Sequence, residues 1–171
     1  AVTHAAVSSA LPLVSSGGYT GFQFPSPLRG GALVDVESIR RVVSPEYFGA
    51  LGIRVRAGRP ILATDTEAAP LAVVVNRSFV SKYLDDMPIE RAIGFSLGGN
   101  AVRLAKGTRD ALIVGVVDDV KQEGPDGPPQ PEMFVSYAQL PAAQQGSQAF
   151  VVLRTIDDPA NHADAVRTAI R

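Results

Sequence analysis

Residues 42–84 read VVSPEYFGALGIRVRAGRPILATDTEAAPLAVVVNRSFVSKYL, which predicts two helices with an apolar strand between them. Ser44 is a favourable N-cap residue and Pro45 suits the first helical position, where no backbone N–H is needed. Glu46 follows in the first turn, where the helix dipole favours a negative charge. Gly52 can take the left-handed conformation that closes a helix. We therefore expect a helix of about two turns before Gly52.

The second half of this stretch predicts a strand followed by another helix. Leu71–Val75 is a run without charge that is rich in β-branched residues, which is typical of a strand covered on both faces. Asn76 can cap the helix that follows. An apolar stripe marks one face of that helix: Phe79, Val80, Tyr83 and Leu84. We expect Asp85–Pro88 to end it, because the residue before proline avoids the helical conformation.

The segments on either side extend this frame with further strands. We expect a strand over residues 2–13 that breaks near Pro12, and others over 32–43, 53–55, 111–117, 133–137 and 150–155. We expect residues 101–104 and 111–117 to form the two arms of a β-hairpin. The last helix opens at Asp158-Pro159, with Ala160, Ala163, Val166 and Ile170 on its inner face.

Glycine, proline and polar residues predict the connecting loops. Residues 14–31 are a Ser/Gly/Pro-rich loop whose aromatic residues we expect to anchor it by packing: Tyr19, Phe22 and Phe24. We expect turns at residues 57–59 and 64–67, and we expect the second turn to be exposed to solvent. Residues 124–131, GPDGPPQP, are too stiff for a sheet interior and predict a surface loop. We expect a mobile loop between residues 137 and 150.

The composition excludes several classes of protein. The 171 residues are 46% hydrophobic and 19% charged, and the net charge of −1 gives no basic surface for nucleic acid or an anionic membrane. The absence of cysteine excludes disulfides, thiol catalysis and zinc-thiolate sites. No signal peptide or transmembrane segment is visible. Both ends are expected to be cut from something longer.

The residues with chemical potential do not form a catalytic or metal-binding motif. His4 and His162 have no second ligand at metal-binding spacing. Three Asp-Asp pairs, at residues 85–86, 118–119 and 157–158, lie where elements end or begin, where aspartate caps helices and turns. Residues 98–100 are a turn without a Walker lysine, and the Asn76-Arg77-Ser78 glycosylation match is accidental. We therefore expect no catalytic, cofactor-binding or metal-binding residue, and no cofactor.

A set of short motifs follows one another along the chain in a recognisable order. They are Val43–Phe48, Leu51–Ile53, Gly58-Arg59, Asp65, Ala72–Asn76, Pro88-Ile89, Ile113–Val117, Asp119-Val120 and Pro131-Glu132. In this order they resemble the extracytoplasmic core domain of MacB-like, FtsX-type ABC transporter permeases. The resemblance covers the chain from about Val2 to its end and is carried by the order of the motifs rather than by any one of them. Glu90 and Asp118 depart from the family pattern at positions where glycine is common, so we expect altered backbone geometry at both turns.

The resemblance implies an α+β fold with two lobes. A membrane-proximal, porter-like lobe of βαβ type is formed by residues 1–60 and 133–171, and a β-rich lobe is inserted as residues 61–132. It further implies a non-catalytic domain on the periplasmic side of the cell membrane, located between the first two transmembrane helices of the permease. The implied partners are a cytoplasmic ATP-binding subunit or domain, reached through transmembrane helices, and either a periplasmic adaptor or a second permease copy.

Two other functions stay open at this level. A ligand-capturing module would have a cleft between the lobes lined by Tyr19, Phe22, Phe24 and Tyr137. An enzyme would need Asp118, Asp119 and either His4 or His162 within hydrogen-bond reach in one cleft. The leading hypothesis is a domain that transmits ATP-driven conformational change for export or periplasmic substrate handling.

Overall fold

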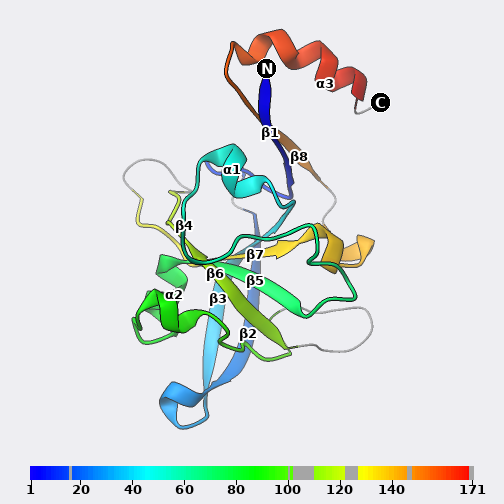
Figure 1. The fold of residues 1–171 in the computed structure, drawn as a ribbon. Coiled ribbons are helices and arrows are strands. Elements are labelled where there is room, and N and C mark those ends of the chain that lie inside the picture. Colours follow the sequence, from blue (N-terminus) through cyan, green and yellow to red (C-terminus); the bar gives the residue numbers. More distant parts are fainter. Residues whose placement is uncertain (16, 100, 102–109, 122–126, 146–147, 170–171) are drawn as a thin grey trace.

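The structure is a computed structural model that describes residues 1–15, 17–99, 101, 110–121, 127–145 and 148–169. Its strands form one mixed sheet in the order β4-β6-β5-β7-β3-β1-β8, with β2 paired to β3 outside this path (Figure 1). The strands are β1 (Val2–Ser8), β2 (Gly18–Ser26), β3 (Ala32–Val43), β4 (Val55–Gly58), β5 (Leu71–Asn76), β6 (Ala111–Val117), β7 (Glu132–Ser136) and β8 (Phe150–Thr155). The α-helices are α1 (Tyr47–Leu51), α2 (Arg77–Tyr83) and α3 (Ala163–Ala169).

Two hydrophobic cores lie on opposite faces of the sheet, because its central strands are buried on both sides. In β5, Val73 and Val75 contribute to the core that contains α2, whereas Val74 contributes to the core that contains α1. In β7, Met133 joins the first core and Phe134 the second. This alternation follows from the period of two along a strand. The predicted burial of Leu71–Val75 on both faces is confirmed.

The predicted helices are present, with one cap assigned wrongly. Gly52 ends α1 in the left-handed conformation (φ 69°), as predicted. Asn76 caps α2 by accepting a hydrogen bond from the Phe79 N–H at 3.0 Å. Ser44, however, does not cap α1, which begins after Glu46 without a side-chain cap. The Ser44 hydroxyl instead accepts a hydrogen bond from the Val7 N–H of β1, a long-range contact that helix-capping rules do not anticipate.

The expected loop over residues 14–31 is wrong, because its centre is the strand β2. Phe22, Phe24 and Ser26 point into the core, and the residues between them face solvent. This is strand alternation in a segment whose glycines and prolines favoured a loop prediction. Tyr19 is 65% exposed, so it does not anchor the segment by burial.

Other boundaries shift by smaller amounts. The strand expected at 53–55 begins later, because β4 spans Val55–Gly58 and takes in most of the turn expected at 57–59. The turn at 64–67 is not fully solvated, because Asp65 is only 4% exposed and its carboxylate accepts hydrogen bonds from Arg59 at 2.7 and 2.9 Å. Between β7 and β8 the structure has two 3-10 turns, Tyr137–Gln139 and Ala142–Gln144. Residues 102–104 of the expected hairpin arm and 124–126 of the expected loop lie outside the described residues, whereas residues 127–131 are described, belong to no helix or strand and are exposed or half-buried, as the loop prediction requires.

The last helix differs from its predicted packing. Asp158 caps the 3-10 turn Pro159–His162 that precedes α3, as the cap-then-proline pattern predicts. The predicted inner face is not buried: Ala160 and Ala163 are exposed and no described residue of α3 is buried. Amphipathic spacing predicts a face but not a packing partner for it.

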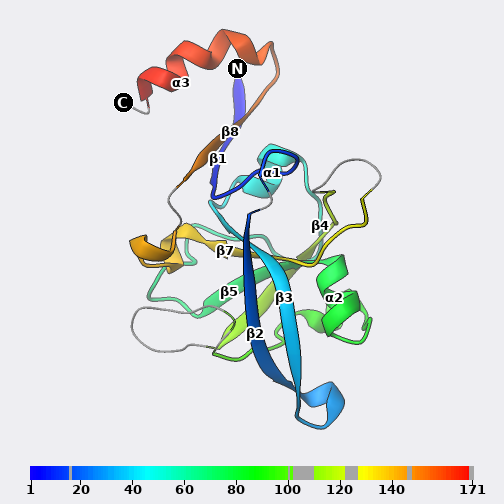
Figure 2. The same cartoon turned by 180° about the vertical axis from the view of Figure 1, so that it is seen from behind.

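The two expected lobes stay a prediction. β5 and β6, from residues 61–132, lie next to each other in the sheet, with β4 on one side of them and β7, β3, β1 and β8 on the other. Seen in Figures 1 and 2, β1, β8 and α3 project from one end of the molecule, and the β2–β3 hairpin extends toward the opposite end. We call the β1–β8 ribbon the stalk and the rest of the sheet with α1 and α2 the body.

Candidate functional site

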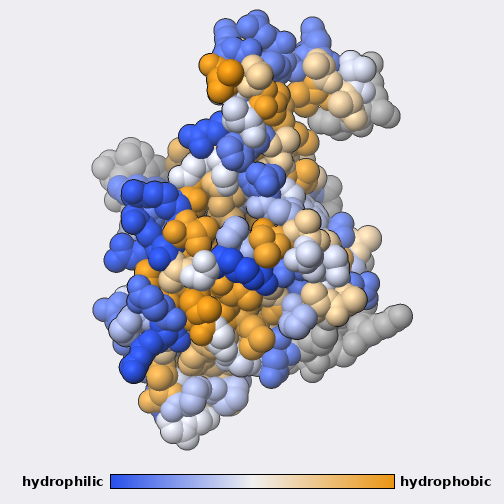
Figure 3. All heavy atoms as spheres, viewed as in Figure 1, coloured by the Kyte–Doolittle hydropathy of each residue, from blue (hydrophilic) through white to orange (hydrophobic). Residues whose placement is uncertain are grey.

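The stalk brings the beginning and the end of the chain together. β1 and β8 pair in antiparallel register from Val2 opposite Thr155 to Ser8 opposite Phe150. β1 pairs with the body at its end, where Ser8 lies opposite Val43 of β3. Apolar surface shows around the stalk (Figure 3), where Val2, Val151 and Ile156 are exposed.

Two reciprocal sets of hydrogen bonds join the stalk to the body. The Val7 N–H donates to the Ser44 hydroxyl and the Ser44 N–H donates to the Val7 carbonyl, both at 2.9 Å. One step further along, the Ser9 N–H donates to the Val42 carbonyl at 2.9 Å and the Val42 N–H donates to the Ser9 hydroxyl at 3.0 Å. The two serine hydroxyls thus accept hydrogen bonds that strand carbonyls would otherwise accept. Together the four hydrogen bonds hold the end of β1 against the end of β3. We call this region the joint.

Helix α1 braces the joint from one side. Arg154 of β8 donates a hydrogen bond to the Gly49 carbonyl at 3.1 Å. The His4 ring lies so close to Gly49 that a Cβ there would approach it to 2.6 Å. Ala6 is buried in the same core as Phe48. Both stalk strands therefore contact α1, which opposes bending of the stalk toward or away from this helix.

A buried ion pair lies behind the joint. Arg41 of β3 and Glu132 of β7 are 0% and 1% exposed, and the Arg41 Nε lies 3.1 Å from Glu132 Oε1. These strands run parallel in adjacent positions. Burial raises the pKa of the nearby Tyr47 phenol to about 12, so Tyr47 is neutral at physiological pH. The ion pair cross-links the two strands that connect the joint to the centre of the sheet.

Asn76 extends these polar contacts to α2. Its Oδ1 accepts hydrogen bonds from the N–H groups of Phe79 at 3.0 Å and Glu132 at 2.9 Å, and its Nδ2 donates to the Gln130 carbonyl at 2.7 Å. Asn76 is fully buried, which excludes glycosylation at this position in the folded domain. The side chain therefore fixes the start of α2 to the start of β7.

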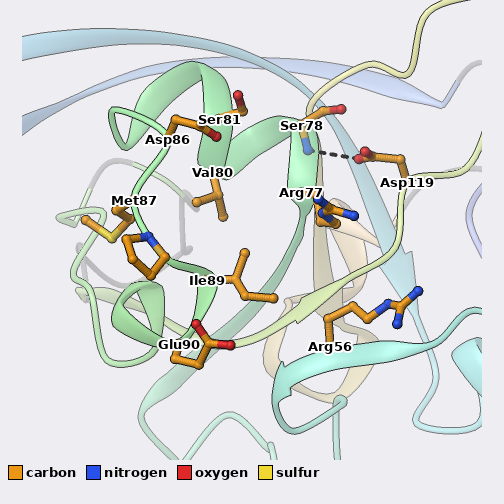
Figure 4. Close-up of a pocket in the computed structure, with 11 residues that line it drawn as sticks. Arg56, Arg77, Ser78, Val80, Ser81, Asp86, Met87, Ile89, Glu90 and Asp119 are labelled. Carbon is orange, nitrogen blue, oxygen red and sulfur yellow. Dashed lines mark hydrogen bonds between the residues drawn. The ribbon is translucent and has the colours of Figure 1, made fainter.

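A cavity that is open to solvent lies beside α2. It has a volume of about 800 Å³. Figure 4 shows Arg56, Arg77 and Asp119 on one side of it and the apolar residues Val80 and Ile89 on the other. Asp119 accepts a hydrogen bond from the Ser78 N–H at 2.9 Å. Charged side chains of both signs line this cavity.

The Asp-Asp pairs serve as ion-pair partners and caps. Asp85 pairs with Arg29, and Asp118 pairs with Arg54 at 3.1 Å and Arg56 at 2.6 Å. The hydrogen bond from Arg56 holds the pKa of Asp118 below its ordinary value. Asp118 and Glu90, the two departures from the family pattern, do not have a positive φ. Neither turn therefore needs glycine.

The structure does not bring the expected enzyme residues together. His4 of the stalk lies beside Thr3 and against Gly49 of α1, and His162 lies 2.8 Å from Asp157. Asp118 lies after β6 against the arginines of the β4 segment. Within the part of the chain that the structure describes, no three acidic or imidazole side chains are grouped as metal ligands would be.

The aromatic cleft expected for a ligand-capturing module is also not formed. Tyr19 faces solvent on β2, whereas Phe22 and Phe24 are buried in the core. Tyr137 packs against that core from its edge. The three aromatic residues of the 14–31 segment therefore do not line one surface.

Comparison with known families assigns the chain. The family model for the MacB-like periplasmic core domain matches residues 2–169. The chain belongs to this family. As a MacB-like periplasmic core domain, it is the extracytoplasmic domain of an ABC transporter permease, and the resemblance that the motif order predicted is confirmed. Among the described residues, no helix has the length and apolar character needed to cross a membrane.

Solved structures share the fold of this MacB-like domain. It is similar to the periplasmic region of MacB from Actinobacillus actinomycetemcomitans, with a TM-score of 0.61, 14% identity, and coverage of 99% of this chain and 65% of that one. A domain described as a permease protein from Porphyromonas gingivalis has a TM-score of 0.58 and 16% identity, with 98% and 69% covered. The extracellular domain of the ABC-type transporter YknZ from Gram-positive bacteria has a TM-score of 0.54 and 14% identity, with 96% and 70% covered. No curated protein matches the chain.

The expected α+β fold class is confirmed by these structures and by the mixed sheet with its helices. The joint was not predicted from the sequence. Arg154 carried a weak signal, because it is the one charged residue in the otherwise uncharged segment 148–156. Ser44 carried a misleading one, because its position before Pro45 is typical of a helix cap.

Proposed function

We propose that this domain is a non-catalytic coupling element that transmits ATP-driven conformational change across the membrane, for export or for handling of periplasmic substrates. The observation that supports this proposal is the stalk. Residues at the two ends of the chain are paired over the length of β1 and β8, so segments that precede and follow the domain act on it through one ribbon. The hydrogen bonds of the joint and the contact of Arg154 with α1 then carry force into the body.

The proposal includes partners that supply and receive the motion. A cytoplasmic ATP-binding subunit or domain hydrolyses ATP and moves the transmembrane helices that flank this domain. A second permease copy or a periplasmic adaptor receives the displacement on the other side. The domain itself needs no catalytic group for this work. What it needs is a body that moves as one unit, and the two cores on either side of β5 provide that stiffness.

The joint variant Ser44→Ala/Arg154→Gln in the full-length permease tests this proposal. It removes the acceptor for the Val7 N–H and replaces the guanidinium that donates to the Gly49 carbonyl with a shorter, uncharged amide. A coupling free energy of about 1–3 kcal/mol corresponds to a change of about 5–150-fold in an equilibrium constant. We therefore expect the transport rate of this variant to fall roughly tenfold while ATP hydrolysis continues. Transport into membrane vesicles and phosphate release, measured on the same preparation, give both quantities.

The matched control is Ser81→Ala/Arg167→Gln, which makes the same substitutions at two exposed positions outside the joint. This variant should transport like the unmodified permease. If the joint variant also transports normally, then the joint does not carry the motion and the proposal is wrong.

Capture of a small molecule or peptide is a second candidate function, favoured by the open cavity beside α2. Its apolar side, with Val80 and Ile89, could hold a nonpolar group while Arg77 or Glu90 binds a polar one. Specific stabilisation of the domain by a compound, abolished by Ile89→Ser, would support this function.

A further inference from the structure

We propose that the outer edge of β2 is a docking site for an extended segment of another extracytoplasmic polypeptide, which adds to the sheet as a further strand. This mode of recognition uses backbone hydrogen bonds for affinity and alternate side chains for specificity. It goes beyond transmission of force, because it assigns a contact surface to β2, which runs from the body in the direction away from the stalk (Figure 2).

The register of the hairpin shows which backbone groups of β2 point outward. The β2–β3 pairing is continuous, with Gly21 opposite Glu37. The N–H and carbonyl of Glu37 point away from β2, because both are hydrogen-bonded to the Tyr83 hydroxyl on the other side of β3. Residues that face each other in antiparallel strands share the same orientation, and the orientation alternates along the strand. The N–H groups of Tyr19, Gly21 and Gln23 therefore point outward from β2.

This outer edge is accessible. Tyr19, Gly21 and Gln23 are all exposed, and the exposed surface of Gly21 is necessarily close to its backbone. In the described part of the chain β2 pairs only with β3. Tyr83 covers the corresponding edge of β3, at 3.0 Å from the Glu37 N–H, whereas Gly21, which lies opposite Glu37, is exposed. Exposed strand edges are usually protected by charge, bulges or covering elements, and β2 contains no charged residue.

The surroundings of this edge indicate the chemistry of the partner segment. On the solvent face of the hairpin, β3 presents the carboxylates Asp35 and Glu37, and Gln23 of β2 donates a hydrogen bond to Asp35. An added strand would lie about 10 Å from β3, two strand spacings, which a lysine or arginine side chain reaches. On the core face, the strand would lie beside Phe22 and Phe24. The partner segment is therefore basic on one face and β-branched or apolar on the other.

Room for such side chains is present at the lower end of the edge. An open cavity of about 460 Å³ is bordered there by Pro25, Phe95 and Gly98. Pro25 ends the run of outward N–H groups. The site thus spans about five residues of an added strand, from Tyr19 to Gln23.

A second copy of the chain does not fit this edge in the membrane. Two β2 strands could pair antiparallel about a two-fold axis at Gly21, but this axis is perpendicular to the strand. β2 runs in the same direction as the stalk (Figures 1 and 2). The stalks of two such copies would point in opposite directions, whereas two permease domains are attached to one membrane. The occupant is therefore a different polypeptide.

Amide hydrogen exchange of this chain tests the proposal with the peptide acetyl-Lys-Val-Thr-Val-Lys-amide as the probe. At a peptide concentration of about ten times Kd, we expect the Tyr19, Gly21 and Gln23 amides to exchange about tenfold more slowly. The same peptide with N-methyl groups on the amides that face β2 should give no protection. The matched peptide with glutamate in place of lysine should bind roughly three- to tenfold more weakly at low salt.

The variant Gly21→Pro removes the central outward N–H without removing a β2–β3 hydrogen bond, and it should abolish protection of Tyr19 and Gln23 while the thermal unfolding temperature stays unchanged. If this variant unfolds, the N-methylated peptide still tests the same bonds. Equal binding of the methylated or glutamate peptide, protection of another strand edge, or no protection at millimolar peptide would overturn the proposal. Protection that rises with protein concentration alone would assign the edge to a second copy and overturn it too.

Discussion

Replacing Arg41 by methionine is expected to lower the free energy of unfolding by about 3–5 kcal/mol. The substitution leaves the Glu132 carboxylate, 1% exposed, without the guanidinium that lies 3.1 Å away. An ion left alone in a buried site loses its hydration without compensation, so the cost exceeds that of an ordinary surface change. Domains of this size have total stabilities of about 5–15 kcal/mol. Denaturation of the purified domain by urea, followed by circular dichroism, measures the change.

The double variant Arg41→Met/Glu132→Leu separates the charge effect from packing. It removes both ions and replaces them with apolar side chains, so we expect it to recover most of the lost stability. If the single and double variants are equally destabilised, the loss comes from packing volume rather than from the buried charge. A single variant as stable as the unmodified domain would contradict the buried ion pair itself.

Asn76→Ala is the second substitution with a large expected effect, about 2–4 kcal/mol. It removes the cap of α2, which is typically worth about 1 kcal/mol. It also leaves the Glu132 N–H and the Gln130 carbonyl without their partner, at a cost of about 1–3 kcal/mol for a buried polar group. The same urea titration measures this variant.

The neighbouring substitution Arg77→Ala provides the control for Asn76→Ala. Arg77 is exposed and follows Asn76 directly in α2, so its replacement should change stability by less than about 0.5 kcal/mol. An Asn76→Ala variant within this small range would show that the three hydrogen bonds of Asn76 do not hold α2 to β7.

The sequence predicted the elements whose signals are local. The apolar run of β5, the stripe on α2 and the positions of Asn76 and Gly52 follow from strand period, helix period and cap chemistry, and all are present. The order of such motifs also sufficed for the family resemblance. These features need no knowledge of what lies across the fold.

Features that depend on distant partners were not predicted. The glycines and prolines around Phe22 and Phe24 predict a loop where the structure has strand β2. The position of Ser44 before Pro45 predicts a cap for α1, but its hydroxyl binds β1. The polar residues around Asp65 predict a solvated turn, but Arg59 and the Leu62 N–H bind its carboxylate. Burial raises the pKa of Asp65, but these hydrogen bonds outweigh burial and hold it below its ordinary value.

The candidate site was missed for the same reason. The stalk depends on the pairing of β1 with β8, which lie at opposite ends of the chain. The last helix showed an apolar face, but its exposure follows from its place beside the stalk rather than against the sheet (Figure 1). Strand pairing at this separation leaves no periodic signal in one sequence.

The stiffness of the stalk relative to the body is the central claim, and one distance measures it. The domain contains no cysteine, so spin labels can be attached at introduced cysteines in a full permease whose other segments have no reactive cysteine. Suitable exposed positions are Val151→Cys on β8 and Leu33→Cys on β3. Pulsed electron paramagnetic resonance then gives the distance between them without nucleotide and in an ATP-trapped state. We predict one narrow distance distribution that is the same in both states; a shift larger than its width, or a second population with ATP, would show that the stalk bends at the joint and would contradict rigid coupling.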